Sequence, residues 1–269
     1  MKVKYISAPY IIWMMLFIFA PLCLVVYFAF TDGAGHFTLS NISRLYGYGA
    51  VFMRSILLAA IATVICLIIA YPASYMLSRL RSSRQKVMLM IIILPMWMNF
   101  LLRTYAWMSL LERNGLINKF LGIFGIGPFN MINTNGAVVL GMVYNYLPFM
   151  IMPLYSIMVK IDHSLIEAAQ DLGGNMWDVL SRVLIPLSMP GITTGITMVF
   201  VPSCSTFAIS RMLGGDTAFM IGDLIDLQFF GNTYNPNLGS AMSLVLMVLV
   251  LRCMIVTNGF ADEDTEVTF

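Results

Sequence analysis

Side chains capable of chemistry are scarce in this chain of 269 residues, and one short segment concentrates them. Residues 161–191 carry four carboxylates and an arginine, which are Asp162, Glu167, Asp171, Asp178 and Arg182. His36 and His163 are far apart in sequence, and the four cysteines lie in apolar stretches without a C-x-x-C pair. Carboxylates with a single histidine among them, and with no second histidine or thiol nearby, are typical of neither metal sites nor nucleophilic centres. We therefore expect no metal site, no cofactor and no catalytic residue.

Motifs of the common membrane and nucleotide chemistries are also missing. The chain has no G-x-x-x-x-G-K-[ST] phosphate loop, no H-E-x-x-H and no G-x-S-x-G. Every Asp and Glu is expected in a loop or tail, whereas proton- or ion-driven transporters place such residues within their spans. Arg103 and Arg252 are expected near enough to span ends for their guanidinium groups to reach water. The chain is thus predicted not to be an enzyme, and energy for any transport must come from a partner.

The first half of the polar segment predicts a short amphipathic helix. Ser164 followed by Glu167 has the spacing of a capping box, in which the hydroxyl and the carboxylate each accept a backbone N–H. The helix is expected over residues 165–172, with Leu165, Ala169 and Leu172 on one face. Gly173 and Gly174 end it, because glycine adopts the left-handed conformation without steric penalty.

The second half predicts another short helix that ends before the next apolar run. Asn175 is expected to cap it, with Asp178 near its positive end. Trp177, Leu180 and Leu184 are expected along its apolar side, and Pro186 and Pro190 are expected to break it. The small side chains at 168, 169 and 173 would let a partner approach the backbone, so the segment is predicted to be a docking site.

The rest of the chain is apolar enough to dissolve in lipid. Hydrophobic residues make up 59% of the chain and charged residues only 10%, whereas soluble domains average about a quarter charged. Runs of about 20 apolar residues are long enough to cross a bilayer. Six are predicted: 10–30, 55–77, 87–110, 137–159, 191–211 and 240–256. The expected fold is therefore an all-α polytopic membrane protein with six transmembrane helices.

Positive charges predict the orientation. Arg79, Arg81, Arg84 and Lys86 crowd the link between spans two and three, which the positive-inside rule places in the cytoplasm. Alternation of the spans then places both termini and residues 161–191 in the cytoplasm. We expect three regions: a first helix with an external segment (1–50), a core of five helices (51–257) and an acidic tail (258–269). The net charge of +2 gives no reason to expect nucleic acid as a partner.

The polar segment resembles the EAA loop of binding-protein-dependent ABC importer permeases. Glu167-Ala168-Ala169, then Gly173 three residues on, then 183–186 (VLIP) follow the family's spacing, with Val183 and Ile185 as conservative departures. The resemblance implies a type I importer fold in a bacterial inner membrane. It implies a heterodimer with a second permease, a cytoplasmic ATPase dimer and an extracytoplasmic solute-binding protein. The implied ATPase-coupling residues are Glu167, Ala168, Ala169, Asp171, Gly173, Trp177, Arg182 and Pro186.

The wider chain resembles the B-type permeases of spermidine/putrescine importers. The matching stretches are 93–103 (ILPMWMNFLLR), 147–155 (LPFMIMPLY), 167–191 and 213–228. The acidic tail departs from the family, whose members commonly end in basic residues. A polyamine is the implied cargo. Another cargo such as thiamine, iron or sulfate, or a scaffold without a transport path, remains an alternative.

A path for a polycation should offer aromatic faces, carbonyl groups and carboxylates. Aromatic side chains are also enriched at membrane interfaces, and prolines inside spans also serve packing, so both features have a purely structural alternative. The prolines at 148 and 153, beside Asn145, predict an irregular helix, and spans three, four and five are expected to line the path. The path candidates are Trp97, Asn99, Tyr105, Tyr144, Asn145, Tyr146, Asp216 and Asp223.

Overall fold

Long apolar helices make up the molecule in a computed structural model that describes residues 8–231 and 234–266. Within this part, the side chains of residues 8, 216, 258 and 260–266 are not described. The described residues form helices and one isolated bridge between Thr31 and Phe37, so the all-α prediction is confirmed. Five helices are long and apolar enough to cross a membrane, and a bent pair makes a sixth candidate.

The first span is continuous but changes helical type in its middle. It consists of α2 (Ala8–Met14), the π-helical η1 (Met15–Phe19) and α3 (Ala20–Ala29). Pro21 follows the π-helical turn, and the helix continues through it. Almost all of the span's described side chains are exposed, and α14 is the helix that packs along it most closely. In a protein of this composition, such a helix needs lipid or another subunit around it.

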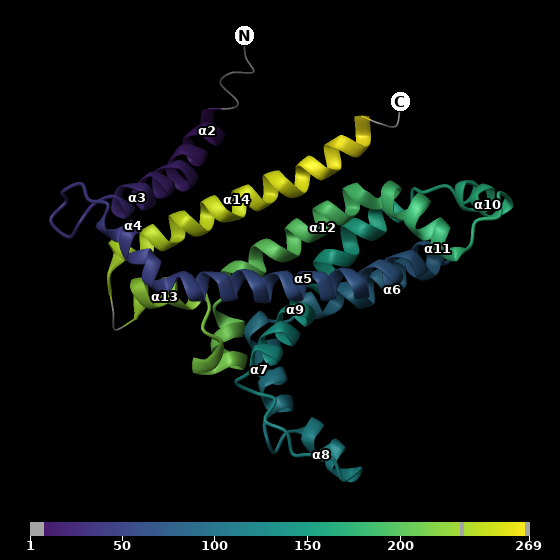
Figure 1. The fold of residues 1–269 in the computed structure, drawn as a ribbon, viewed down its shortest axis with the longest axis horizontal. Coiled ribbons are helices and arrows are strands. Elements are labelled where there is room, and N and C mark those ends of the chain that lie inside the picture. The colour runs from purple at the N-terminus through teal and green to yellow at the C-terminus, as the bar shows by residue number, and fades with distance from the viewer. Residues whose placement is uncertain (1–7, 232–233, 267–269) are drawn as a thin grey trace.

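Three central helices form the core. A short helix α4 (Ser40–Arg44) and a 3-10 turn η2 (Leu45–Tyr48) lead into α5 (Gly49–Ser78). Helix α9 (Asn135–Met158) packs along α5 on one side and along α12 (Ile185–Ser205) on the other (Figure 1). Gly191 of α12 permits close contact, because a Cβ there would lie 3.0 Å from the carbonyl oxygen of Pro153. Small residues at helix contacts are the usual way for membrane helices to pack.

The third predicted span is broken. Helix α6 (Ser82–Ile93) and η3 (Leu94–Trp97) meet α7 (Phe100–Leu111) and α8 (Leu116–Ile123) at a bend of 89°. Pro95 begins the 3-10 turn and Met98 and Asn99 are extended. The predicted third span over 87–110 is therefore present as a bent pair of helices and not as one straight helix. The physical reason is that Asn99 caps a new helix, accepting the backbone N–H of Leu101 at 2.8 Å.

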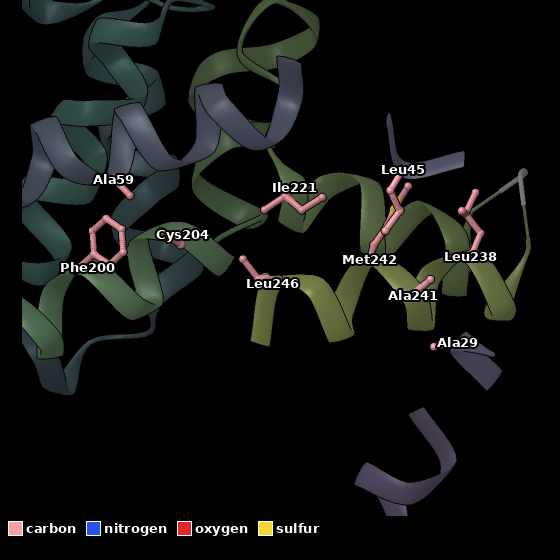
Figure 2. Close-up of a cluster of buried hydrophobic side chains, with 10 residues drawn as sticks. All are labelled: Ala29, Leu45, Ala59, Phe200, Cys204, Ile221, Leu238, Ala241, Met242 and Leu246. Atoms are coloured by element: carbon pink, nitrogen blue, oxygen red, sulfur yellow. The ribbon is translucent and has the colours of Figure 1, made fainter. Parts of the chain in front are cut away.

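The last helix of the chain packs beside the first span. Two short turns, η5 (Ser210–Gly214) and η6 (Gly215–Ala218), precede α13 (Ile221–Phe230) and the final helix α14 (Pro236–Glu266). Helix α14 lies beside α3, and Figure 2 shows how a cluster of buried side chains joins α3, α5, α12, α13 and α14. Met242 of α14 and Phe200 of α12 are among its members. Residues 258–266, which belong to the predicted tail, continue the helix α14.

Candidate functional site: the helical corner of residues 161–191 and its surroundings

A helical corner protrudes at one end of the molecule, opposite the end where α4 and α13 lie (Figure 1). It consists of α10 (His163–Asp171), the turn at 172–175 and α11 (Met176–Val179). The two short helices predicted from sequence are therefore present, with α10 beginning two residues earlier than expected. The link between α5 and α6, which carries the arginine-rich segment, lies at the same end.

The cap of α10 differs from the prediction. Asp162 is the N-cap, and its carboxylate accepts the backbone N–H of Ser164 at 3.0 Å. This hydrogen bond holds the pKa of Asp162 below its ordinary value, because it stabilises the charged form. Glu167 is instead paired with His163, whose Nδ1 lies 2.9 Å from its Oε1. The predicted Ser164–Glu167 capping box is therefore wrong; an aspartate two residues before Ser164 was the better sequence signal.

The apolar side of α10 is centred on a residue that the sequence analysis did not single out. Ile166 is buried, whereas Leu165 is 47% exposed and Leu172 is 90% exposed. The prediction that Leu165, Ala169 and Leu172 form the buried face is therefore wrong for the two leucines. Ala169 is partly buried. A two-turn helix with a single buried contact leaves most of its surface free.

The glycine pair forms the predicted corner. Gly173 has a φ of +86°, in the left-handed region that disfavours every side chain with a Cβ. Gly174 donates its backbone N–H to the carbonyl of Ala169, and a Cβ at Gly174 would lie 2.6 Å from that oxygen. A cleft of about 310 Å³ opens here, lined by Ala169, Leu172, Gly173, Gly174, Asp178, Arg182 and Val183.

The second helix does not stop at the prolines. Asn175 caps α11 in a capping box with Asp178, as predicted. The chain then continues through the π-helical η4 (Leu180–Leu184) directly into α12, so that residues 176–205 form one rod. Pro190 and Pro202 lie inside α12 without ending it, and Pro186 follows η4. The wider π-helical turn before it makes room for the ring, so the predicted break at Pro186 and Pro190 is wrong.

The remaining coupling candidates lie on this rod and on α10. Trp177 is 72% exposed, and not packed against Leu184 as predicted; Val179 and Leu184 are the buried residues. Arg182 reaches Asp178 one turn earlier, with 3.6 Å between its Nη2 and Oδ1. Asp171 and Ala168 are exposed at the end of α10 and in its middle.

The path candidates are spread over several elements, which are η3, α7, α9, η6 and α13, and they are not gathered at one point. Tyr144 packs edge-on against Trp107 and lines an apolar cleft of about 690 Å³ between α5, α7 and α9. Trp97, 83% exposed, lines a different groove along α6. Tyr105 is 55% exposed on α7, and Asn99 is the helix cap described above.

Helix α9 is continuous through both of its prolines, contrary to the expected irregularity. Asn145 is buried and donates its Nδ2 to the carbonyl of Gly141 at 2.9 Å. The hydroxyl of Tyr146 donates to the carbonyl of Pro202, linking α9 to α12. These two path candidates therefore have structural contacts of their own.

Charged residues near the spans also depart from prediction. Asp223 is not in a loop: it lies in the first turn of α13, is fully buried and caps that helix by accepting the backbone N–H of Met220. Arg103 is buried at 8% exposure on α7 instead of extending to a span end. The side chain of Asp216 lies outside the part that the structure describes.

Comparison with known proteins gives the family. Residues 67–262 match the model of the family described as binding-protein-dependent transport system inner membrane component. The chain is 38% identical to the spermidine/putrescine transport system permease protein PotB of Haemophilus influenzae, covering 88% of this chain and 86% of that one. It is 37% identical to PotB of Escherichia coli strain K12, with coverage of 88% and 90%.

Solved structures agree on the fold. A bacterial ABC transporter that imports the acidic polysaccharide alginate matches with a TM-score of 0.81 at 16% identity, covering 99% of this chain and 96% of that one. The same kind of transporter in complex with its pentasaccharide-bound periplasmic protein matches with a TM-score of 0.80, also at 16% identity, covering 96% and 93%. At this identity, the likeness shows the fold alone. The chain therefore belongs to the binding-protein-dependent transport system inner membrane components, and it is a multi-pass permease subunit of a bacterial inner membrane.

Proposed function

We propose that this permease imports polyamines, with spermidine and putrescine as substrates. One observation carries the proposal: proteins named as spermidine/putrescine permeases are 37–38% identical to this chain over nearly their whole length. The alternatives of thiamine, iron or sulfate have no comparable support. The chain itself does no covalent chemistry in this proposal; it binds substrate differently in two conformations.

The helical corner is the proposed docking point of a separate cytoplasmic ATPase dimer. Its support is the combination of an exposed short helix, a left-handed glycine and an adjoining cleft of about 310 Å³. Glu167 and Asp171 provide exposed carboxylates on the same short helix. An arginine or lysine of the ATPase would replace His163 as the partner of Glu167, because an always-charged group binds a carboxylate more strongly.

Movement of the corner would reach the spans through one small buried cluster. Ile166 of α10, Val179 of α11 and Leu184 of η4 are its buried members, and Tyr75 of α5 packs against them. Because residues 176–205 are one continuous helix, a displacement of α10 acts directly on α12. The lever in this proposal is therefore a rigid rod with a short arm at its end.

The proposed complex contains a second permease and an extracytoplasmic binding protein. The first span supports the second permease, because it exposes nearly all of its apolar side chains within the described part of the chain. The alginate transporter supports the binding protein, because its structure includes a periplasmic protein. The binding protein would deliver substrate, and ATP-driven closure would switch access from one side to the other.

The test is uptake by the complete complex in proteoliposomes with ATP inside. We expect uptake of radiolabelled spermidine and putrescine that depends on both ATP and the binding protein. Unlabelled polyamine should compete, whereas thiamine, ferric iron and sulfate should not. Uptake of thiamine, ferric iron or sulfate instead would overturn the proposed cargo, but it would not affect the family assignment.

A matched control distinguishes transport by the complex from assembly of the complex without transport. The Walker-lysine variant of the ATPase should form the same complex and take up no substrate. If the wild-type complex forms and hydrolyses ATP without transporting a polyamine, thiamine, iron or sulfate, the scaffold alternative gains support.

A further inference from the structure

An ion-pair triad joins two elements that follow the fifth span. The guanidinium of Arg211, in η5, lies 2.7 Å from Asp226 Oδ2 and 3.9 Å from Asp223 Oδ1. Both aspartates belong to α13. Element η5 packs against α7 and α9, which are two of the helices expected to line the substrate path. The triad therefore lies beside the region where a translocated molecule is expected to pass.

The inner member of the triad is a carboxylate held away from water. The side chain of Asp223 is only 1% exposed. Its Oδ2 caps α13, but its Oδ1, which faces Arg211, accepts no hydrogen bond from the residues that the structure describes. Burial raises the pKa of Asp223, because the charged form loses its hydration. A buried carboxylate of this kind needs a cation beside it to stay ionised.

The position of Asp223 is fixed by the packing of α13. The backbone N–H of Ile221 donates to the hydroxyl of Ser55 at 2.8 Å, which ties the start of α13 to α5. A Cβ at Gly222 would lie 2.5 Å from the carbonyl oxygen of Thr206, so α13 also sits directly on the end of α12. The anionic part of the triad is thus preorganised.

The other two members are accessible. The side chain of Arg211 is 48% exposed and that of Asp226 is 22% exposed. Arg211 comes from a different element than the carboxylates, and it can rotate into water without unfolding α13. Since guanidinium and ammonium groups are both charged N–H donors, either can neutralise the pair.

We propose that Asp223 and Asp226 bind one ammonium group of a cationic amine, and that Arg211 occupies their site in the empty permease and leaves when the amine arrives. The proposal rests on the polyamine function proposed above and adds the site of recognition. Exchange of one cation for another keeps the buried carboxylate neutralised throughout. Arg211 therefore competes with substrate, and its removal should strengthen binding, whereas a purely structural ion pair predicts no such gain.

The experiment measures equilibrium binding of radiolabelled spermidine to the purified complex of both permeases and the ATPase, without the binding protein. Asp226→Asn should weaken binding at least fivefold, and Arg211→Gln should strengthen it by a similar factor. Arg44→Gln is the matched control, because Arg44 is an exposed arginine of α4, outside the triad. Putrescine should compete for the site, and 1,4-butanediol, with hydroxyls in place of ammonium groups, should not.

Opposite shifts for the two substitutions are the decisive result. If both weaken binding, or neither changes it, the triad is only a structural tie and the proposal fails, although spermidine uptake by the wild type would still support the proposed function. Should Arg211→Gln not assemble, Arg211→Lys replaces it: the ammonium of lysine lacks the fixed, planar fork of a guanidinium and competes less well for the two carboxylates, so binding should tighten in the same direction by a smaller factor. A wild-type complex that binds and transports no polyamine would overturn the proposed function itself.

Discussion

Single residues set the geometry of the proposed coupling corner. Gly173 turns the chain with a φ of +86°, and a Cβ added there would meet no atom within 4 Å. The constraint at this position is therefore conformational rather than steric. A left-handed conformation costs an ordinary L-residue about 1–2 kcal/mol, and asparagine is among the few that tolerate it.

Gly173→Val should therefore uncouple the transporter. A β-branched residue disfavours the turn, so α10 loses its angle to the rod and ATP hydrolysis proceeds with little uptake. Gly173→Asn, which keeps the turn, should retain most uptake. Both rates are measured in proteoliposomes, with membrane insertion checked by immunoblot. Equal uptake by the Val and Asn variants would show that the turn has no role in coupling.

At the scale of elements, the broken third span and the continuous fifth span matter most. The bend of 89° between η3 and α7 depends on a new helix start at Asn99, whose Oδ1 accepts the backbone N–H groups of Leu101 and Leu102. The rod from 176 to 205 shows the opposite behaviour, because it continues through Pro186, which follows a π-helical turn, and through Pro190 and Pro202 inside α12. Proline by itself therefore did not predict where a span breaks.

Asn99→Ala should destabilise the bend. Loss of a side-chain cap costs about 1 kcal/mol, because the two backbone N–H groups lose their acceptor. We expect a lower midpoint of thermal unfolding for the purified complex, while Asn99→Ser, which can still accept, stays near wild type. Asn130→Ala, at an exposed loop position, is the control. An unchanged midpoint for Asn99→Ala would mean that the apolar packing around α7 suffices.

At the scale of the whole molecule, the distribution of positive charge predicts the orientation in the membrane. The arginine-rich link and α10 lie at one end of α5, and α4 lies at the other (Figure 1). The positive-inside rule places the first end in the cytoplasm. Both termini are expected on that side as well, since six spans return the chain to its starting side.

Labelling of introduced cysteines tests this orientation. Leu172 near the corner and Tyr46 near the opposite end are each 90% exposed. With the four native cysteines replaced, a membrane-impermeant maleimide should label Tyr46→Cys in intact spheroplasts and Leu172→Cys only in inverted vesicles. Labelling of Leu172→Cys from outside would reverse the topology and exclude the corner as an ATPase docking site.

Much of this architecture can be predicted from short stretches of sequence. Long apolar runs predict spans because lipid offers no partner for exposed backbone groups, and only helices satisfy them internally. The glycine at 173 and the Asn175–Asp178 cap act within a few residues, so their geometry follows from local chemistry. The family also followed from local spacing, since the motif around Glu167 lies within one loop.

Contacts between residues that are distant in sequence could not be predicted from short stretches of the chain. The sequence near Asp223 does not indicate that Arg211 and Ser55 contact helix α13. The burial of Asp223 depends on the packing of α13 against α5 and α12. Ile166 rather than Leu165 is buried because Tyr75, about ninety positions away, packs on that side. Local chemistry determined which segments are helical and where some of them begin and end. Burial, ion pairing and the bend of the third span were decided only by the tertiary structure. The physical reason is that the interaction energies behind them depend on contacts between segments that are distant in sequence and close in space.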